Sequence, residues 1–188
     1  MLKKSHHYIN FYKAYMISNI FEINCININI IDWDNKKKNL LKLLDNYPEE
    51  SKEFFHTNKH LPRSGLLPEF CEMFDPEIIQ MQKETKMRVH IKDVWTVTYK
   101  KNEFHNPHNH GHLGFNGVLY LDYIREEHSP TYFVCPFPNP LDDKSMMCSS
   151  DVYEGQILAV PAYLTHYTSP NKSKKPKRIL AFDFNLVP

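Results

Sequence analysis

Two histidine-bearing segments constrain the fold of this chain more than any other feature. The first contains His108 and His110, separated by one residue, and the second ends much later at His166. In an extended strand, side chains two positions apart project from the same face, so residues 108–110 are expected to form a strand that aims both imidazoles at one point. A third imidazole can reach that point only from a strand folded back beside the first. We therefore expect a barrel or sandwich in which three imidazoles surround one metal ion.

The size and charge of the chain limit the alternatives. Its 188 residues are 41% hydrophobic and 24% charged, which suits one domain with a single core. The formal net charge is +1, from 23 basic and 22 acidic side chains. The chain as a whole lacks the strong positive field that phosphate backbones require, so no nucleic-acid partner is expected.

The cysteines and the hydropathy pattern indicate a cytoplasmic protein. The four cysteines are scattered without a C-x-x-C pair, and the first residues lack the apolar region of a signal peptide. No run approaches the roughly 18 to 20 apolar residues that span a bilayer. The sequence therefore predicts a soluble protein with reduced thiols and no membrane association.

The first half of the chain is expected to supply one strand and supporting helices. Residues 25–31 alternate isoleucine with asparagine, as an edge strand would. A leucine stripe predicts a helix over residues 36–47, capped by Asp34. Residues 48–67 have the composition of a loop, and a second helical stretch follows over 68–86, where Pro76 favours an internal helix start.

From Val89 onward the hydrophobic period changes to two, which predicts strands separated by turns. The expected strands cover residues 94–100, 108–110, 117–123, 131–137, 156–161 and 178–186. Helices followed by many short strands indicate an antiparallel β-sandwich or barrel with a helical layer packed on one sheet. Residues 1–188 are thus expected to form one domain, with supporting elements in 1–88 and the β core in 89–188.

Four segments of the strand-rich half carry a resemblance to a known family. They are residues 95–110, 116–122, 155–166 and 178–185. Together they resemble the core of the Fe(II)- and 2-oxoglutarate-dependent oxygenases, particularly small phage and bacterial ones, and more distantly the prolyl 4-hydroxylases. The resemblance implies an all-β core folded as a double-stranded β-helix, or cupin-like jelly roll. It also implies hydroxylation of an unidentified substrate with Fe(II), 2-oxoglutarate and O2, releasing succinate and CO2.

The resemblance also assigns the metal ligands. His108 and His166 correspond to the two iron-binding histidines, and His110 occupies the position that usually holds Asp or Glu. A third neutral imidazole would leave the iron site with two net positive charges, which strengthens attraction for anionic 2-oxoglutarate. Either His110 is a true ligand, or a carboxylate such as Asp122, or water, completes the site.

Arg178 opens the last strand and shares a face with Leu180, Phe182 and Phe184. The resemblance implies that its guanidinium binds the distal carboxylate of 2-oxoglutarate through a two-pronged contact. The alternative is that Arg178 only extends the solvated basic run that ends at Lys177. Tyr99, Tyr120 and Asn116 stand where related enzymes place further groups that contact the cosubstrate. The alternative for both tyrosines is ordinary core packing.

Two other function classes stay open. A three-histidine cupin dioxygenase of the thiol-oxidising kind would need no 2-oxoglutarate, and a non-catalytic jelly-roll module for sugar or protein binding would need no iron. The expected loops at residues 124–130 and 138–152 suit either a small-molecule or a peptide substrate. The remaining histidines, including His105 and His112 beside the motif, are expected to be surface or structural residues.

Overall fold

A computed structural model of the protein describes residues 23–138, 143–149 and 151–188. The helices are α1 (Trp33–Leu44), α2 (Leu66–Met73) and α3 (Asp75–Thr85). The strands are β1 (Ile26–Asn29), β2 (Glu50–Ser51), β3 (His56–Thr57), β4 (Arg88–Tyr99), β5 (His105–His108), β6 (Phe115–Asp122), β7 (Thr131–Pro138), β8 (Ser145–Ser149), β9 (Gln156–Pro161), β10 (His166–Thr168) and β11 (Lys177–Val187).

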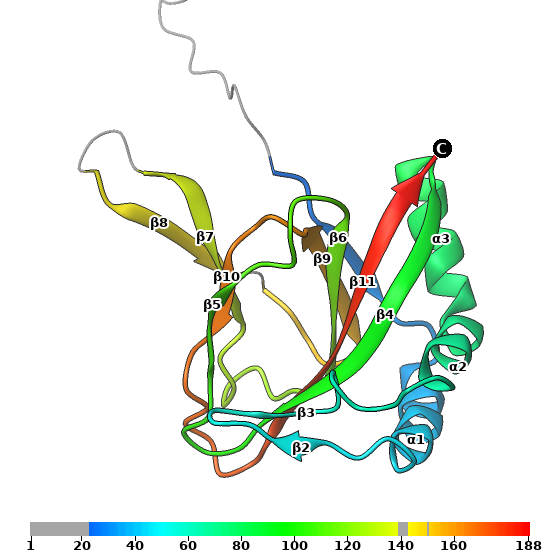
Figure 1. Ribbon diagram of the computed structural model, residues 1–188, viewed down its shortest axis with the longest axis horizontal. Coiled ribbons are helices and arrows are strands. Elements are labelled where there is room, and N and C mark those ends of the chain that lie inside the picture. The colour runs from blue at the N-terminus through cyan, green and yellow to red at the C-terminus, as the bar shows by residue number, and fades with distance from the viewer. Residues whose placement is uncertain (1–22, 139–142, 150) are drawn as a thin grey trace, which may run out of the picture.

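The strands form two antiparallel sheets. The larger sheet has the order β1-β9-β6-β11-β4-β3-β2, and the smaller has the order β5-β10-β7-β8. In Figure 1 the larger sheet lies between the three helices and the smaller sheet. This is the expected jelly roll with a helical layer on one face, and β1 occupies the predicted edge position.

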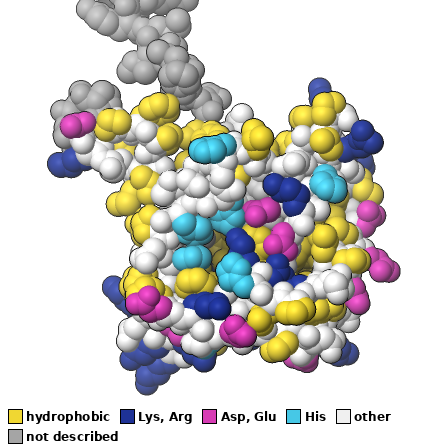
Figure 2. Space-filling model, viewed as in Figure 1, with side chains coloured by type: hydrophobic (Ala, Val, Ile, Leu, Met, Phe, Trp, Pro, Cys, Tyr) yellow, Lys and Arg dark blue, Asp and Glu magenta, His cyan; other side chains and the backbone are white. Residues whose placement is uncertain are grey.

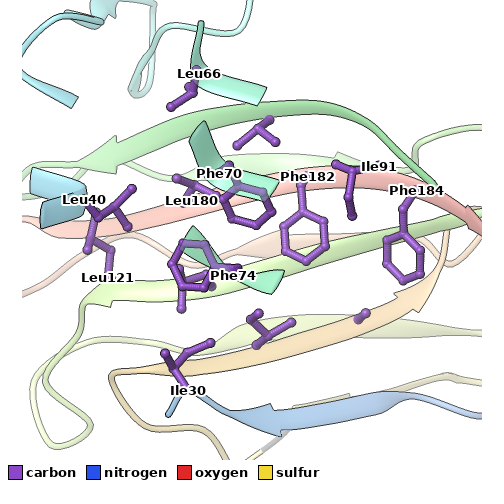
Figure 3. Close-up of a cluster of buried hydrophobic side chains, with 14 of the residues drawn as sticks. Ile30, Leu40, Leu66, Phe70, Phe74, Ile91, Leu121, Leu180, Phe182 and Phe184 are labelled. Carbon is purple, nitrogen blue, oxygen red and sulfur yellow. The ribbon is translucent and has the colours of Figure 1, made fainter. Parts of the chain in front are cut away.

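The helices cover the outer face of the larger sheet. Phe70 and Phe74 of α2 and the following turn, together with Leu40 of α1, pack on Leu180 and Phe182 of β11 (Figure 3). The ring centroids of Phe70 and Phe182 are 5.2 Å apart. None of the helices in the described residues has the length and apolar character needed to cross a membrane.

Both predicted helical stretches are helical in the structure, but their first and last residues differ from the predicted ones. The buried stripe of α1 includes Leu40, Leu43 and Leu44, but the helix begins and ends three residues earlier than expected. Its N-cap is Asp32, in a left-handed conformation, so the expectation that Asp34 caps the helix is wrong. The second helical stretch is divided at Phe74 into α2 and α3, and proline stands in the first turn of α3 as predicted.

Several strands differ from the predicted ones. The change of period is confirmed, because β4 begins at Arg88 and runs without interruption. Two strands were not predicted: β8, in which every residue is exposed, and β10, which has only three residues. Two short strands, β2 and β3, lie within the segment expected to be a loop.

Alternation along β11 determines what faces the space between the two sheets. Ile179 and Ala181 belong to the cluster of buried side chains between the sheets, whereas Leu180 and Phe182 belong to the cluster under the helices. Strand side chains alternate between faces, so Lys177 projects with Ile179, and Arg178 projects with Leu180. Both faces of this strand are buried, which leaves its sequence with no polar face.

Candidate metal centre

Three imidazoles converge between the sheets. His108, His110 and His166 each offer a ring nitrogen, and these nitrogens all lie within 4.8 Å of one another. His108 at the end of β5 and His166 at the start of β10 are direct partners in the antiparallel ladder. The structure thus brings together the three histidines that the sequence singled out.

His110 is positioned by contacts other than the predicted ones. Strand β5 spans residues 105–108, so the two histidines of the motif do not share one strand face as expected. Instead, the backbone N–H of His110 donates to the carbonyl of Ala162, at 2.8 Å. The His110 ring also stacks on Trp95 of β4, with ring centroids 5.7 Å apart. A backbone bond and an aromatic contact therefore hold the third imidazole in place.

Hydrogen bonds at Nδ1 orient all three rings. His108 and His166 each place Nδ1 against a backbone carbonyl two residues earlier, at 2.8 and 3.0 Å. His110 places Nδ1 2.9 Å from a carboxylate oxygen of Asp183 on β11. Such acceptors hold a proton on Nδ1 and leave the Nε2 lone pair free for a metal. Three neutral nitrogen donors with their lone pairs available fit a divalent transition metal such as iron.

The electrostatics of the site favour the metal-binding form of the rings. Burial, together with the neighbouring histidines, lowers the pKa of His166 to about 4. Burial also lowers the pKa of His108. Both rings are therefore neutral near pH 7, the form that binds metal without first losing a proton. Burial disfavours the charged form of Asp183, but hydrogen bonds from His110 and Asn116 outweigh it and lower its pKa.

The histidines form part of the wall of a cavity of about 540 Å³. Figure 2 shows histidine side chains gathered on this face of the molecule, close to basic side chains. The volume lies within the range of small-molecule sites. The lining residues are Lys52, Phe55, Thr57, Lys59, His60, Trp95, Val97, Tyr99, His105, His108, His110, Asn116, Val118, Thr131, His166, Thr168, Ile179 and Ala181.

Two of the four predicted cosubstrate contacts reach this cavity. Tyr99 lines it, and Asn116 lies beside the metal centre, where its amide contacts His110 at 3.3 Å and Asp183 at 3.1 Å. Tyr120 is fully buried nearby and donates to the Thr131 hydroxyl at 3.1 Å, but it does not line the cavity.

The structure does not bring Arg178 to the cavity. Its side chain projects on the helical face of β11, where its Nε lies 3.6 Å from a carboxylate oxygen of Asp122. Asp122 in turn contacts Lys37 of α1 at 2.9 Å and stands at the opposite end of β6 from Asn116. Neither Arg178 nor Asp122 therefore occupies the place expected for it, and Asp122 is too remote to be the third ligand.

Sequence reasoning missed three side chains around the site. Asp183, which orients His110, and Lys177 both lie on the face of β11 that points between the sheets. Charged residues at alternate positions of an apolar strand were the available signal, but the expected cosubstrate contact was Arg178, which lies on the opposite face. His105, expected to be incidental, stacks on His108 with centroids 4.0 Å apart and contacts the Tyr99 hydroxyl at 3.3 Å. Burial lowers the pKa of His105 to about 3.

Comparisons with known proteins find a similar fold in several solved structures. No family model and no curated protein sequence matches the chain. A 2OG-Fe(II) oxygenase family protein from Burkholderia pseudomallei is similar in structure, with a TM-score of 0.61, 11% identity, and coverage of 85% of this chain and 84% of that one. HygX from Streptomyces hygroscopicus, crystallised with nickel and 2-oxoglutarate, is similar with a TM-score of 0.65 and 11% identity, and the match covers 87% of this chain and 83% of that one. A Pseudomonas putida prolyl-4-hydroxylase is similar with a TM-score of 0.58 and 9% identity, and the match covers 87% of this chain and 92% of that one. At identities this low, the structural similarity shows a shared fold and nothing further.

The contact between Asp183 and His110 leads to a testable expectation. Replacing Asp183 by asparagine removes the negative charge that supports the ring, so metal affinity should fall by about 10-fold or more. Competition with a chelating dye would measure the affinity, and the absorption bands of bound Co(II) would report the altered coordination. Glu84→Gln, a change on the exposed surface of α3, is the matched control. Equal affinities for the two variants would contradict a positioning role for Asp183.

Proposed function

We propose that this protein is an Fe(II)- and 2-oxoglutarate-dependent oxygenase that hydroxylates a small-molecule or peptide substrate, with release of succinate and CO2. The observation that carries the proposal is the convergence of three oriented imidazoles in the wall of a cavity within a jelly roll. The structural neighbours add support, because those similar in fold include oxygenases crystallised with 2-oxoglutarate.

In this proposal His108, His110 and His166 would hold the iron. Iron supplies the oxidising chemistry, with O2 and 2-oxoglutarate as co-reactants. The protein residues orient the ligands: Asp183 and Asn116 hold His110, and two backbone carbonyls hold the other rings. Trp95, Val118 and Ala181 contribute an apolar part of the cavity wall beside these histidines.

Lys177, rather than Arg178, is our candidate for binding the distal carboxylate of 2-oxoglutarate. Lys177 does not itself line the cavity, but its ammonium lies 5.5 Å from the ring of Tyr99, which does. Its side chain is 1% exposed and surrounded by the rings of Tyr99, Tyr120 and Tyr123, 5.5 to 5.8 Å from the ammonium. One of its three N–H donors is used by the carbonyl of Ser129, at 2.8 Å. No carboxylate partner is found for it among the described residues. A buried cation without a counter-ion is costly, and an entering carboxylate would relieve that cost.

This lysine does not separate the proposal from the thiol-oxidising alternative, because cysteine carries a carboxylate as 2-oxoglutarate does. Ligand binding separates the two. The non-catalytic alternative is disfavoured because a plain binding module has no need for three imidazoles with their Nε2 lone pairs free.

Thermal unfolding under anaerobic Fe(II) tests the proposal. We expect 2-oxoglutarate at about 100 times its dissociation constant to stabilise the protein by about 2.7 kcal/mol, and cysteine to have no effect. On admission of O2, succinate should form from 2-oxoglutarate. Protection by cysteine alone would favour the three-histidine dioxygenase, and failure to retain any metal would favour a non-catalytic module.

A further inference from the structure

The cavity is lined by two lysines and by no carboxylate among the described residues. Lys52 and Lys59 line it together with His60, and all three come from the segment that includes β2, β3 and the loop that follows. No acidic side chain lines the cavity among the described residues. A concave site with one sign of charge and apolar walls concentrates ligands of the opposite sign.

Lys59 is the lysine best placed to meet such a ligand. Its ammonium lies 4.0 Å from the centroid of the Trp95 ring, and Trp95 stacks on His110. It is half-buried and has no ion-pair partner among the described residues. Lys52 differs, because its ammonium is 3.4 Å from a carboxylate oxygen of Glu50 and both groups are largely exposed. A cation without an ion-pair contact among the described residues therefore stands one aromatic ring away from His110.

The charges of the proposed active site leave this cation unpaired after the cosubstrate has bound. Three neutral imidazoles leave the two positive charges of Fe(II) intact, and the two carboxylates of 2-oxoglutarate balance them. Asp183 attracts Lys59 at longer range but is in direct contact with His110. Lys59 therefore has no carboxylate in ion-pair contact among the described residues, beside the space that is left for the substrate.

We propose that the substrate is a small organic anion whose carboxylate or phosphate group binds Lys59. This inference rests on the proposed function and narrows its substrate class. The apolar part of the substrate lies against Phe55, which lines the cavity and packs on His105 with ring centroids 4.2 Å apart. The volume of about 540 Å³ has to hold the cosubstrate as well, which favours a small molecule over a folded partner.

Matched probes test the charge preference. Benzoate and benzamide have nearly the same shape and differ in charge, and phenyl phosphate tests the other anion. Their dissociation constants would be measured by ligand-observed NMR on the protein loaded with diamagnetic Zn(II) and 2-oxoglutarate, and also on the metal-free protein. We expect benzoate or phenyl phosphate to bind about tenfold more tightly than benzamide, and the stronger of the two identifies the preferred anion.

Variants of Lys59 link that preference to one side chain. Lys59→Gln is expected to abolish it, Lys59→Arg to keep it, and Lys83→Gln on the exposed surface of α3 to leave it unchanged. Equal binding of benzoate and benzamide to the wild-type protein would overturn the inference, as would a preference that survives in Lys59→Gln. Weakened 2-oxoglutarate binding in Lys59→Gln would also overturn it, by assigning Lys59 to the cosubstrate. If the wild-type protein does not bind 2-oxoglutarate but shows the Lys59-dependent preference for anions, the result would count against the oxygenase proposal alone.

Discussion

Replacing His166 by alanine is expected to abolish both iron retention and the release of succinate from 2-oxoglutarate. The ring is buried, is the direct ladder partner of His108, and is oriented by the carbonyl of Leu164. Loss of an outer hydrogen-bond partner alone costs about 10- to 100-fold in metal affinity, so loss of a ligand should cost well over about 100-fold. Metal content after dialysis and succinate yield under Fe(II) would measure both effects.

His112→Ala is the matched control for this experiment. His112 belongs to the same histidine-rich stretch, but its side chain is exposed and does not line the cavity. It should retain iron and turnover at the wild-type level. Because a cavity at a buried position also lowers stability, thermal unfolding of the metal-free His166→Ala protein would establish that it is folded. Undiminished turnover in His166→Ala would reject this histidine as a ligand.

The sequence identified the right histidines for a reason that was only partly correct. Spacing alone predicted that His108 and His110 share a strand face, whereas the strand ends at His108. The position of His110 depends on Ala162 and Trp95, which are distant in sequence. Contacts of that kind follow from how the strands pair, and local periodicity carries no information about them.

The interpretation of β11 failed for a related reason. Alternation correctly grouped Arg178 with Leu180 and separated both from Lys177, but it did not indicate which set faces the cavity. The helices cover one face of this strand and the smaller sheet covers the other, so both faces are apolar. Only the position of the helical layer decides between them, and it places Lys177 on the inner side. Strand β8 was not predicted because both of its faces are exposed, so no alternation of apolar and polar residues marks it.

The pKa of Lys177 makes the behaviour of this residue dependent on pH. Burial lowers it to about 7 from an ordinary value of 10.5. Between these values the unfolded chain holds a proton that the folded protein lacks, so the contribution of Lys177 to stability improves as pH rises from about 7 to about 10. Below pH 7 the full cost of burying the charge is present. A bound carboxylate favours the charged form, so 2-oxoglutarate binding above pH 7 should take up a proton, measurable by calorimetry in buffers of different ionisation enthalpy.

Replacing Lys177 by methionine should therefore change ligand affinity and stability in opposite directions. Methionine keeps the length and apolar stem but removes the charge, so affinity for 2-oxoglutarate should fall by about 2–5 kcal/mol. The ligand-free variant should be more stable than the wild-type protein at pH 6, because it no longer carries an unpaired buried ammonium. At pH 10 this gain in stability should be smaller, because the folded wild-type protein then holds Lys177 in its neutral form. Arg178→Met is the control, since Arg178 is the adjacent residue on the opposite face of β11. If affinity falls in Arg178→Met and not in Lys177→Met, the carboxylate of 2-oxoglutarate binds the arginine and β11 presents its other face to the site.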